Sequence, residues 1–169
     1  MDTDVSQPIT IYTIGHSDHP IAAFLALLQQ HGIALVTDVR SQPYSQWVPQ
    51  FNRENLIRDL QAAGIRYAFL GDSLGGRPKD RRMYDPGEDH PNYARLAASP
   101  AYRAGIAQLL ELAAGARTAI LCSEGDHHHC HRGKLITPTL LARGVRVLHI
   151  TPEGDLVDAG AELQQLRFF

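Results

Sequence analysis

The sequence predicts an α/β domain: a three-layer sandwich in which helices cover both faces of a mainly parallel, five-stranded sheet. Two observations lead to this prediction. Short runs rich in β-branched residues alternate along the chain with segments whose apolar residues recur at helical spacing. The short runs are also apolar throughout, as in strands that are buried on both faces. We therefore expect Rossmann-like βαβ units, with connecting helices on both sides of the sheet.

The first part of the chain contains two strand-helix repeats and a third strand. Gly32 and Gly64 mark the helix ends, and Pro20 and Asn52 mark the helix starts, Asn52 as a side-chain cap. The strands are expected at residues 9–14, 34–39 and 65–70.

The second part of the chain continues the alternation. Ser99 and Pro100 open a helix, and strands are expected at 118–122 and 145–151. Between these strands, one helix runs from Cys130 through Leu141 with a kink at Pro138, or a second helix begins at Thr137. A short helix near residues 161–168 closes the domain.

The domain organisation is expected to be simple. Residues 1–8 are polar and are predicted to be disordered or extended, and residues 9–169 form a single α/β domain. A long connection at 71–99 has two Gly-Pro-rich turns, and in a compact domain such a segment is a lid, a binding loop or a disordered segment. It also holds a basic cluster: Arg77, Lys79, Arg81 and Arg82.

Composition excludes some classes of protein. The chain has 169 residues, 44% of them hydrophobic, and a net charge of −2, so no overall positive charge favours nucleic acid or a membrane surface. No apolar stretch reaches membrane-spanning length, and the N-terminus lacks a signal-peptide core, so we expect a cytoplasmic protein with no membrane partner. In that compartment Cys122 and Cys130 would be reduced.

Polar residues follow several of the predicted strands. In parallel sheets ligands bind beyond the carboxyl ends of the strands, so these residues are expected to share one edge. The first strand leads to His16 and Ser17 and the second carries Asp38 and Arg40. The fourth leads to Cys122, Ser123 and Glu124.

These segments resemble a known family. The motifs are Thr13-Ile14-Gly15-His16-Ser17, Asp38-Val39-Arg40 with Pro43 and Ser45, Gly71 with Gly75, Cys122-Ser123-Glu124, and Cys130-His131-Arg132. They occur in order from about residue 10 to residue 151 and are similar to the family called domain of unknown function 488. The resemblance implies an intracellular α/β protein with a polar site, and it implies no reaction.

Three interpretations of the segment 121–132 stay open. Helix-start amide groups with Arg40 and Arg132 would bind a phosphate or carboxylate. Alternatively, a zinc or iron ion would be held by the soft or borderline ligands of the segment and of the first strand end: Cys122, Cys130, His131 and His16. In the third interpretation, Cys122 or Cys130 is a nucleophile whose pKa is lowered by the helix end or by an imidazolium.

The leading hypothesis is an enzyme, of the hydrolase or transferase class, that acts on a small anionic or nucleotide-like substrate and needs no assigned cofactor. The predicted catalytic residues are Cys122, Cys130, His16, His131 and Glu124. The predicted substrate-binding residues are Ser17, Arg40, Ser123, Arg132 and Trp47.

The other readings are a metal-dependent enzyme and a non-catalytic module that binds nucleic acid or a protein partner through Trp47 and the basic cluster. Several residues also have purely structural interpretations. His149 is then a hydrogen-bonded core histidine, Asp38 and Arg40 form a loop-holding pair, and residues 127–129 form a solvated loop. The oligomeric state is not predicted.

Overall fold

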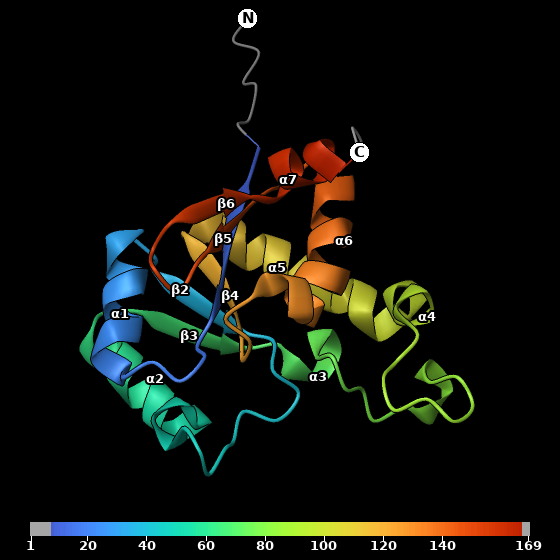
Figure 1. The fold of residues 1–169 in the computed structure, drawn as a ribbon, viewed down its shortest axis with the longest axis horizontal. Coiled ribbons are helices and arrows are strands. Elements are labelled where there is room, and N and C mark those ends of the chain that lie inside the picture. The colour runs from blue at the N-terminus through green and yellow to red at the C-terminus, as the bar shows by residue number, and fades with distance from the viewer. Residues whose placement is uncertain (1–7, 167–169) are drawn as a thin grey trace, which may run out of the picture.

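The structure is a computed structural model that describes residues 8–166. The segment predicted to be disordered or extended, except for Pro8, lies outside the described residues, as does the end of the last predicted helix. The α/β prediction is confirmed: helices flank a mixed, mostly parallel sheet on both sides (Figure 1). Among the described residues, no helix combines the length and apolar character needed to cross a bilayer.

The strands and helices follow the predicted order closely. The strands are β1 (Thr10–Gly15), β2 (Leu35–Asp38), β3 (Arg66–Phe69), β4 (Thr118–Cys122), β5 (Arg146–Ile150) and β6 (Leu156–Asp158). The helices are α1 (Ile21–Gln30), α2 (Arg53–Ala62), α3 (Gly71–Leu74), α4 (Tyr93–Ala98), α5 (Pro100–Gly115), α6 (Thr137–Ala142) and α7 (Ala159–Leu166). Short 3₁₀ turns occur at Pro49–Phe51, Arg81–Met83 and His127–His129, and a π-helix spans Arg132–Ile136.

The sheet has six strands, so the prediction of five was wrong. The strand order is β3-β2-β4-β1-β5-β6, and β6 is antiparallel to β5 while all other pairs are parallel. The sixth strand has only three residues, too few for a periodic pattern to be recognised. The connectivity also differs from a simple Rossmann unit, because β4 lies between β1 and β2.

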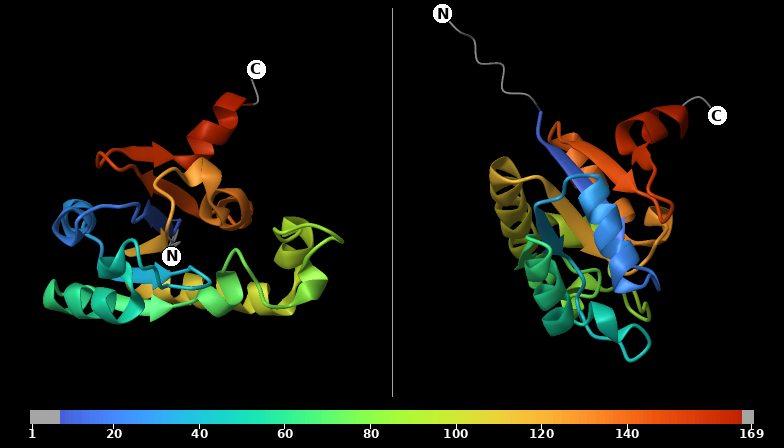
Figure 2. Two further views of the ribbon diagram at one scale, coloured as in Figure 1. Left: turned by 60° about the horizontal axis from the view of Figure 1, so that its bottom comes forward. Right: turned by 90° about the vertical axis from the view of Figure 1, so that its left-hand side faces the viewer.

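Two hydrophobic cores lie on the two faces of the sheet. Helices α1 and α2 pack Phe24, Leu28 and Leu56 against one face, and α5 and α6 pack Ile106 and Leu140 against the other (Figure 2). Along β4, Ala119 and Leu121 belong to the first core and Ile120 to the second. Because side chains alternate along a strand, Cys122 lies on the same face as Ile120.

Helix ends were predicted with mixed success. Ser99 caps α5 as expected, since its hydroxyl accepts the N–H of Tyr102. The capping role of Asn52 was wrong: its side-chain oxygen accepts the N–H of Ser45, which ties down the preceding loop instead.

The segment around Pro138 combines both alternatives. The carbonyl of Cys130 accepts the N–H groups of Gly133 and Lys134, so helical bonding begins there as expected. The chain then forms the π-helix and passes into α6, whose second residue is Pro138. A proline needs no N–H partner in the first turn of an α-helix, and the wider π turn absorbs the break.

The connection at 71–99 is ordered into several short elements rather than one open loop. It contains α3, a 3₁₀ turn and α4, and Asn92 caps α4 by accepting the N–H of Arg95. The segment projects from one end of the molecule (Figure 2). Helix α3 and the Gly75-Gly76 turn bring its first part back against the end of the sheet.

Candidate active site at the carboxyl end of β4

The carboxyl end of β4 is a point at which chain connections diverge. The neighbouring strands β1 and β2 lead to α1 and α2 on one face, whereas β4 leads to α6 on the other. Such switch points leave a crevice beyond the strand ends in parallel sheets. The loop after β4 crosses directly over Gly15, where a Cβ atom would overlap the carbonyl group of Glu124.

Cys122 and Cys130 form a disulfide across this crevice, so the expectation of two reduced cysteines was wrong for this structure. Cys122 ends β4 and Cys130 precedes the π-helix, and both are buried. Their Cα atoms are 7.3 Å apart. This separation exceeds the usual disulfide span of about 4.4–6.8 Å.

His131 faces both sulfur atoms through one ring nitrogen. Its Nδ1 is 3.8 Å from Sγ of Cys122 and 3.9 Å from Sγ of Cys130. Its Nε2 donates a hydrogen bond of 3.0 Å to the carbonyl of Val39. Burial lowers the pKa of His131 to about 4, so the ring is neutral at pH 7. A neutral ring with its proton on Nε2 presents the Nδ1 lone pair to both sulfurs.

Cys130 has an additional contact that Cys122 lacks. Its Sγ accepts the backbone N–H of Arg132 at 3.4 Å, as the hydroxyl of a capping serine would. An N–H group at a helix start stabilises a thiolate, so Cys130 is the better placed of the two cysteines to act as a nucleophile.

Arg132 is fully buried and holds the loop that carries Cys130. Its guanidinium donates to the Thr13 hydroxyl at 2.8 Å, to the Glu124 carbonyl at 2.9 Å and to the Gly125 carbonyl at 3.1 Å. These contacts leave Arg132 to position the site in this structure rather than to touch a substrate.

Arg40 is likewise engaged inside the protein. It forms a two-point ion pair with Asp38 and donates to the carbonyl of Phe51 at 2.8 Å. Tyr67 also donates to Asp38, at 2.5 Å. The loop-holding pair foreseen for Asp38 and Arg40 is therefore present, and Arg40, predicted to bind substrate, is only 5% exposed.

His16 reaches the same edge but points to the opposite face of the sheet. Its backbone N–H donates to the Cys122 carbonyl at 3.0 Å, while its ring stacks on Phe51 at 4.4 Å. Alternation along the chain places the His16 side chain with Ile14 and away from Cys122. The structure therefore joins the two segments through their backbones. His16 lies outside the group formed by Cys122, Cys130 and His131, which we call the sulfur cluster.

We expect His16 to make the protein sensitive to mild acid. Burial lowers the pKa of His16 to about 4, from 6.5 for an exposed ring. A depressed pKa contributes stability above pH 6.5 that is lost as the pH falls toward 4, because the unfolded chain then binds more protons. When the pH falls from about 7.5 to about 5, the free energy of unfolding of the His16→Asn variant should decrease by about 2 kcal/mol less than that of the wild type. Urea unfolding at both pH values measures the difference, and an identical loss in the two proteins would contradict it.

The remaining predicted site residues lie at the carboxyl edge of the sheet but do not contact the sulfur cluster through their side chains. Ser123 and Glu124 are exposed, and their carbonyl groups, rather than their side chains, make the recorded hydrogen bonds, to Ser17 and Arg132. Ser17 has a left-handed φ of 49° and links the β1–α1 turn to the β4 loop. Trp47 lies in the loop after β2 with 84% of its surface exposed.

Three contributors to the site were not predicted from the sequence. The Val39 carbonyl fixes the tautomer of His131, and backbone groups carry no residue-type signal. Gly76 lies flat against the His131 ring, where a Cβ atom would be 2.9 Å away. Thr13 accepts from Arg132 and bonds His149 at 2.6 Å; its signals are its place in the motif Thr13–Ser17 and its polar side chain within a buried strand, and neither predicts this role.

A model of one protein family matches residues 20–137 of the chain, and its description is domain of unknown function DUF488. The match covers more than half of the sequence. The chain belongs to the DUF488 family. Comparisons with curated proteins and with solved structures found no significant match.

The DUF488 match includes the segments that build the sulfur cluster. Asp38–Arg40, Cys122–Glu124 and Cys130–Arg132 all lie within it, whereas Thr13–Ser17 precedes it. The resemblance noted from the motifs is thereby confirmed. The family description assigns no reaction, so chemistry must be argued from the geometry.

A cleft of about 940 Å³, which we call the basic cleft, is lined by the segment that follows Gly76 and by the start of α5 in this DUF488 chain. Its lining includes Ser41, Arg77, Lys79, Arg82 and Arg95, on the projecting segment and the end of β2. Arg82 pairs with Asp80 and Arg95 with Asp85, but among the described residues no carboxylate pairs with Arg77 or Lys79. Two cationic side chains are thus available to an anion beside the Gly76 turn.

A metal ion also fits the cluster in its reduced form. The ligand atoms of Cys122, Cys130 and His131 all lie within 4.8 Å of one another. The bond from His131 to the Val39 carbonyl is the kind of outer contact that orients a metal-binding histidine. His16 is not part of this group.

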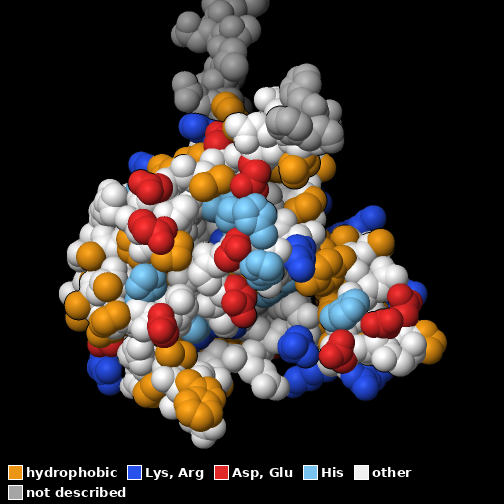
Figure 3. All heavy atoms as spheres, in the orientation of Figure 1, with side chains coloured by type: hydrophobic (Ala, Val, Ile, Leu, Met, Phe, Trp, Pro, Cys, Tyr) orange, Lys and Arg blue, Asp and Glu red, His pale blue; other side chains and the backbone are white. Residues whose placement is uncertain are grey.

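The histidines of residues 127–129 are only partly solvated, which corrects the expectation of a solvated loop. His128 and His129 are exposed, but His127 is buried and stacks on His149 with ring centres 3.7 Å apart. Figure 3 shows histidine and acidic side chains gathered on this face. The core role of His149 is confirmed, since it is buried and bonded to Thr13.

Proposed function

We propose that this DUF488 protein is an enzyme that performs thiol–disulfide exchange on a small anionic substrate. Cys130 is the attacking thiol, His131 the proton acceptor and Cys122 the resolving thiol. One observation carries the proposal: a single neutral imidazole nitrogen faces both sulfurs at nearly equal distances of 3.8 and 3.9 Å.

The reaction balances in two steps. In the reduced protein, Cys130 transfers its proton to Nδ1 of His131, where the new thiolate stabilises the imidazolium as an ion pair, and the thiolate attacks one sulfur of a substrate disulfide. The other substrate sulfur leaves as a thiolate and takes that proton. Cys122 then loses its proton to the same nitrogen and attacks the sulfur of Cys130, which releases the second substrate thiol. The enzyme dithiol is oxidised by two electrons to a disulfide, and the substrate disulfide is reduced to two thiols.

The electrostatics of the edge favour an anionic substrate. Gly76 packs on the His131 ring, and Arg77, the next residue in the chain, lines the basic cleft. Arg77 is also anchored, because its backbone N–H donates to the Ser41 hydroxyl at 2.9 Å. A carboxylate or phosphate held by Arg77 and Lys79 would bring the rest of the substrate toward the sulfurs.

Oxidised glutathione, a small anionic disulfide, provides the test. We expect the Cys122→Ser variant to accumulate a mixed disulfide on Cys130, because the resolving thiol is missing. The additional change His131→Gln should slow its formation about a hundredfold through loss of the proton acceptor. Intact-protein mass spectrometry over time measures both rates.

Matched variants separate this mechanism from general thiol reactivity. Cys130→Ser should form the mixed disulfide far more slowly than Cys122→Ser. Arg77→Ala should raise the glutathione disulfide concentration needed for half-maximal rate, whereas Arg58→Ala, a change at an exposed arginine of α2, should not. Equal rates for the two cysteine variants, with no effect of residue 131, would overturn the proposal.

A metal-dependent enzyme is the second candidate, favoured by the ligand atoms of Cys122, Cys130 and His131, which lie within 4.8 Å of one another. In that case protein purified with a reductant should contain about one zinc or iron ion per chain at this cluster. Elemental analysis of the wild type and Cys122→Ser decides the matter. Metal that is lost in Cys122→Ser would support this candidate, and metal-free wild-type protein would exclude it.

A further inference from the structure

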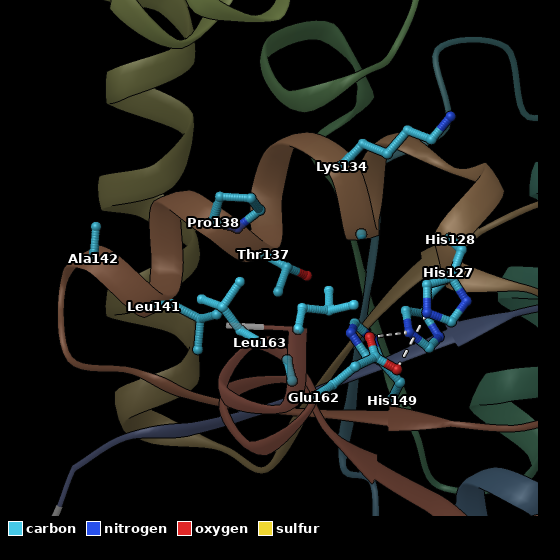
Figure 4. A pocket seen from close by; sticks show the side chains of 13 residues that line it. His127, His128, Lys134, Thr137, Pro138, Leu141, Ala142, His149, Glu162 and Leu163 are labelled. Atoms are coloured by element: carbon cyan, nitrogen blue, oxygen red, sulfur yellow. Dashed lines mark hydrogen bonds and ion pairs between the residues drawn. The ribbon is translucent and has the colours of Figure 1, made fainter. Parts of the chain in front are cut away.

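A second cavity, separate from the sulfur cluster, lies between α6 and α7. Its volume is about 530 Å³. Figure 4 shows Pro138, Leu141 and Leu163 along its apolar part and imidazole and carboxylate groups at the other end. The polar groups come from the 3₁₀ turn His127–His129, from β5 and from α7, so three separate segments of the chain meet there.

Glu162 joins two of the histidines at the polar end. Its Oε1 is 3.0 Å from Nε2 of His127, and its Oε2 is 3.2 Å from Nε2 of His128 (Figure 4). Nitrogen and oxygen ligands that bind one tetrahedral zinc ion at 2.0–2.2 Å are themselves about 3.3–3.6 Å apart. The donor atoms at this site are a few tenths of an ångström closer, as hydrogen-bonded partners, so a small outward shift of Glu162 would admit an ion in place of the bridging protons.

The outer contacts of the histidines also suit metal binding. Nδ1 of His128 is 2.8 Å from the Asp126 carboxylate and Nε2 faces Glu162, so a metal ion that replaces the Nε2 proton leaves Nδ1–H bonded to Asp126. A carboxylate on the far nitrogen is the usual support for a metal-binding histidine. The ring of His127 is fixed in turn by its stacking on His149.

His149 supplies an unused polar atom at the same end of the cavity. It is 1% exposed and lines the cavity, and its Nδ1 is bonded to Thr13. Thr13 accepts from Arg132 and keeps its own proton to donate to Nδ1; with that donation the ring proton of His149 is on Nε2. Among residues 8–166 no recorded hydrogen bond involves that Nε2, which leaves it free to donate to an oxygen atom in the cavity.

We propose that His127, His128 and Glu162 form a binding site for a divalent first-row transition-metal ion at the mouth of this cavity. Two imidazoles and one carboxylate are a ligand set that zinc and iron(II) enzymes use while leaving positions open. The open positions face an apolar space, with Nε2 of His149 beside them. This site is independent of the thiol–disulfide proposal, because it shares no ligand with Cys122, Cys130 or His131.

Cobalt(II) titration of the oxidised protein tests the site, since a disulfide offers no thiolate to the metal. We expect one Co²⁺ per chain with visible absorption typical of nitrogen and oxygen ligands and no thiolate charge-transfer band. Glu162→Gln and His128→Ala should each weaken binding at least about tenfold, and Asp126→Asn about tenfold through the outer contact. Addition of Zn²⁺ should displace the cobalt.

His129→Ala is the matched control, because His129 belongs to the same histidine run but is exposed and contacts only Asp126. Its affinity for Co²⁺ should equal that of the wild type. Thermal melting of each variant checks that it is folded, and zinc-dependent melting of the wild type gives a second readout that Glu162→Gln should lack. Absence of stoichiometric binding, or an equal loss in His129→Ala and Glu162→Gln, would overturn the proposal.

Discussion

The Asp38→Asn variant is expected to be less stable than the wild type by about 3–5 kcal/mol. Asp38 has no exposed surface, and its carboxylate accepts the backbone N–H of Arg40, two guanidinium N–H groups of Arg40 and the Tyr67 hydroxyl. Asparagine keeps the shape but removes the charge, so the buried guanidinium loses its counter-ion. Urea denaturation at neutral pH measures the loss.

The chain contains a matched control for this change. Asp80 binds Arg82 with the same two-residue spacing and the same two-point geometry, but the pair is at the surface, with 86% of the Arg82 side chain exposed. Asp80→Asn should therefore cost less than about 1 kcal/mol. Similar losses in the two variants would show that burial of the Asp38 pair has no energetic role.

The second large effect is expected from Arg132→Met. Methionine fills much of the same volume but leaves Thr13 and the carbonyl groups of Glu124 and Gly125 without their charged donor. Each of the three lost bonds is worth about 1.5–3 kcal/mol, so we expect a loss of at least about 4 kcal/mol. Burial lowers the pKa of Arg132 only to about 10, so the wild-type side chain is cationic at pH 7.

Arg132→Met should also weaken the disulfide. The loop that Arg132 holds carries Cys130, and a looser loop lowers the effective concentration of one thiol near the other. In a series of glutathione redox buffers, the equilibrium constant for disulfide formation should fall about tenfold. Lys134→Met, at an exposed position on the same π-helix, should leave both stability and this equilibrium unchanged. An unchanged equilibrium in Arg132→Met would argue against the positioning role.

Local sequence signals were sufficient for most of the fold. Strand β4 was predicted at its observed bounds, because an apolar run between a helix end and a polar loop has few alternatives. Ser99 and Pro100 likewise marked the start of α5. Strand order could not be predicted from local patterns, because it depends on long-range pairing. Strand β4 lies between β1 and β2, which precede it in the sequence by about eighty residues or more.

The sequence predicted which strand ends meet at the candidate site, but it did not predict the directions of their side chains. The meeting of His16 with Cys122 follows from parallel strands, and their backbones are hydrogen-bonded. Their side chains diverge because each follows the alternation of its own strand. His131 was a candidate from its motif, but its position between the sulfurs depends on the Val39 carbonyl, a backbone contact across ninety-two residues of sequence.

The tautomer of His131 tests the central claim most directly, since the whole site depends on one ring nitrogen facing two sulfurs. Long-range ¹H–¹⁵N NMR of histidine-labelled protein reports which nitrogen carries the proton. We expect the proton on Nε2, and an Nδ1 resonance that shifts when the Cys122–Cys130 disulfide is reduced. A proton on Nδ1, or an Nδ1 resonance that is the same in the oxidised and reduced proteins, would contradict the account.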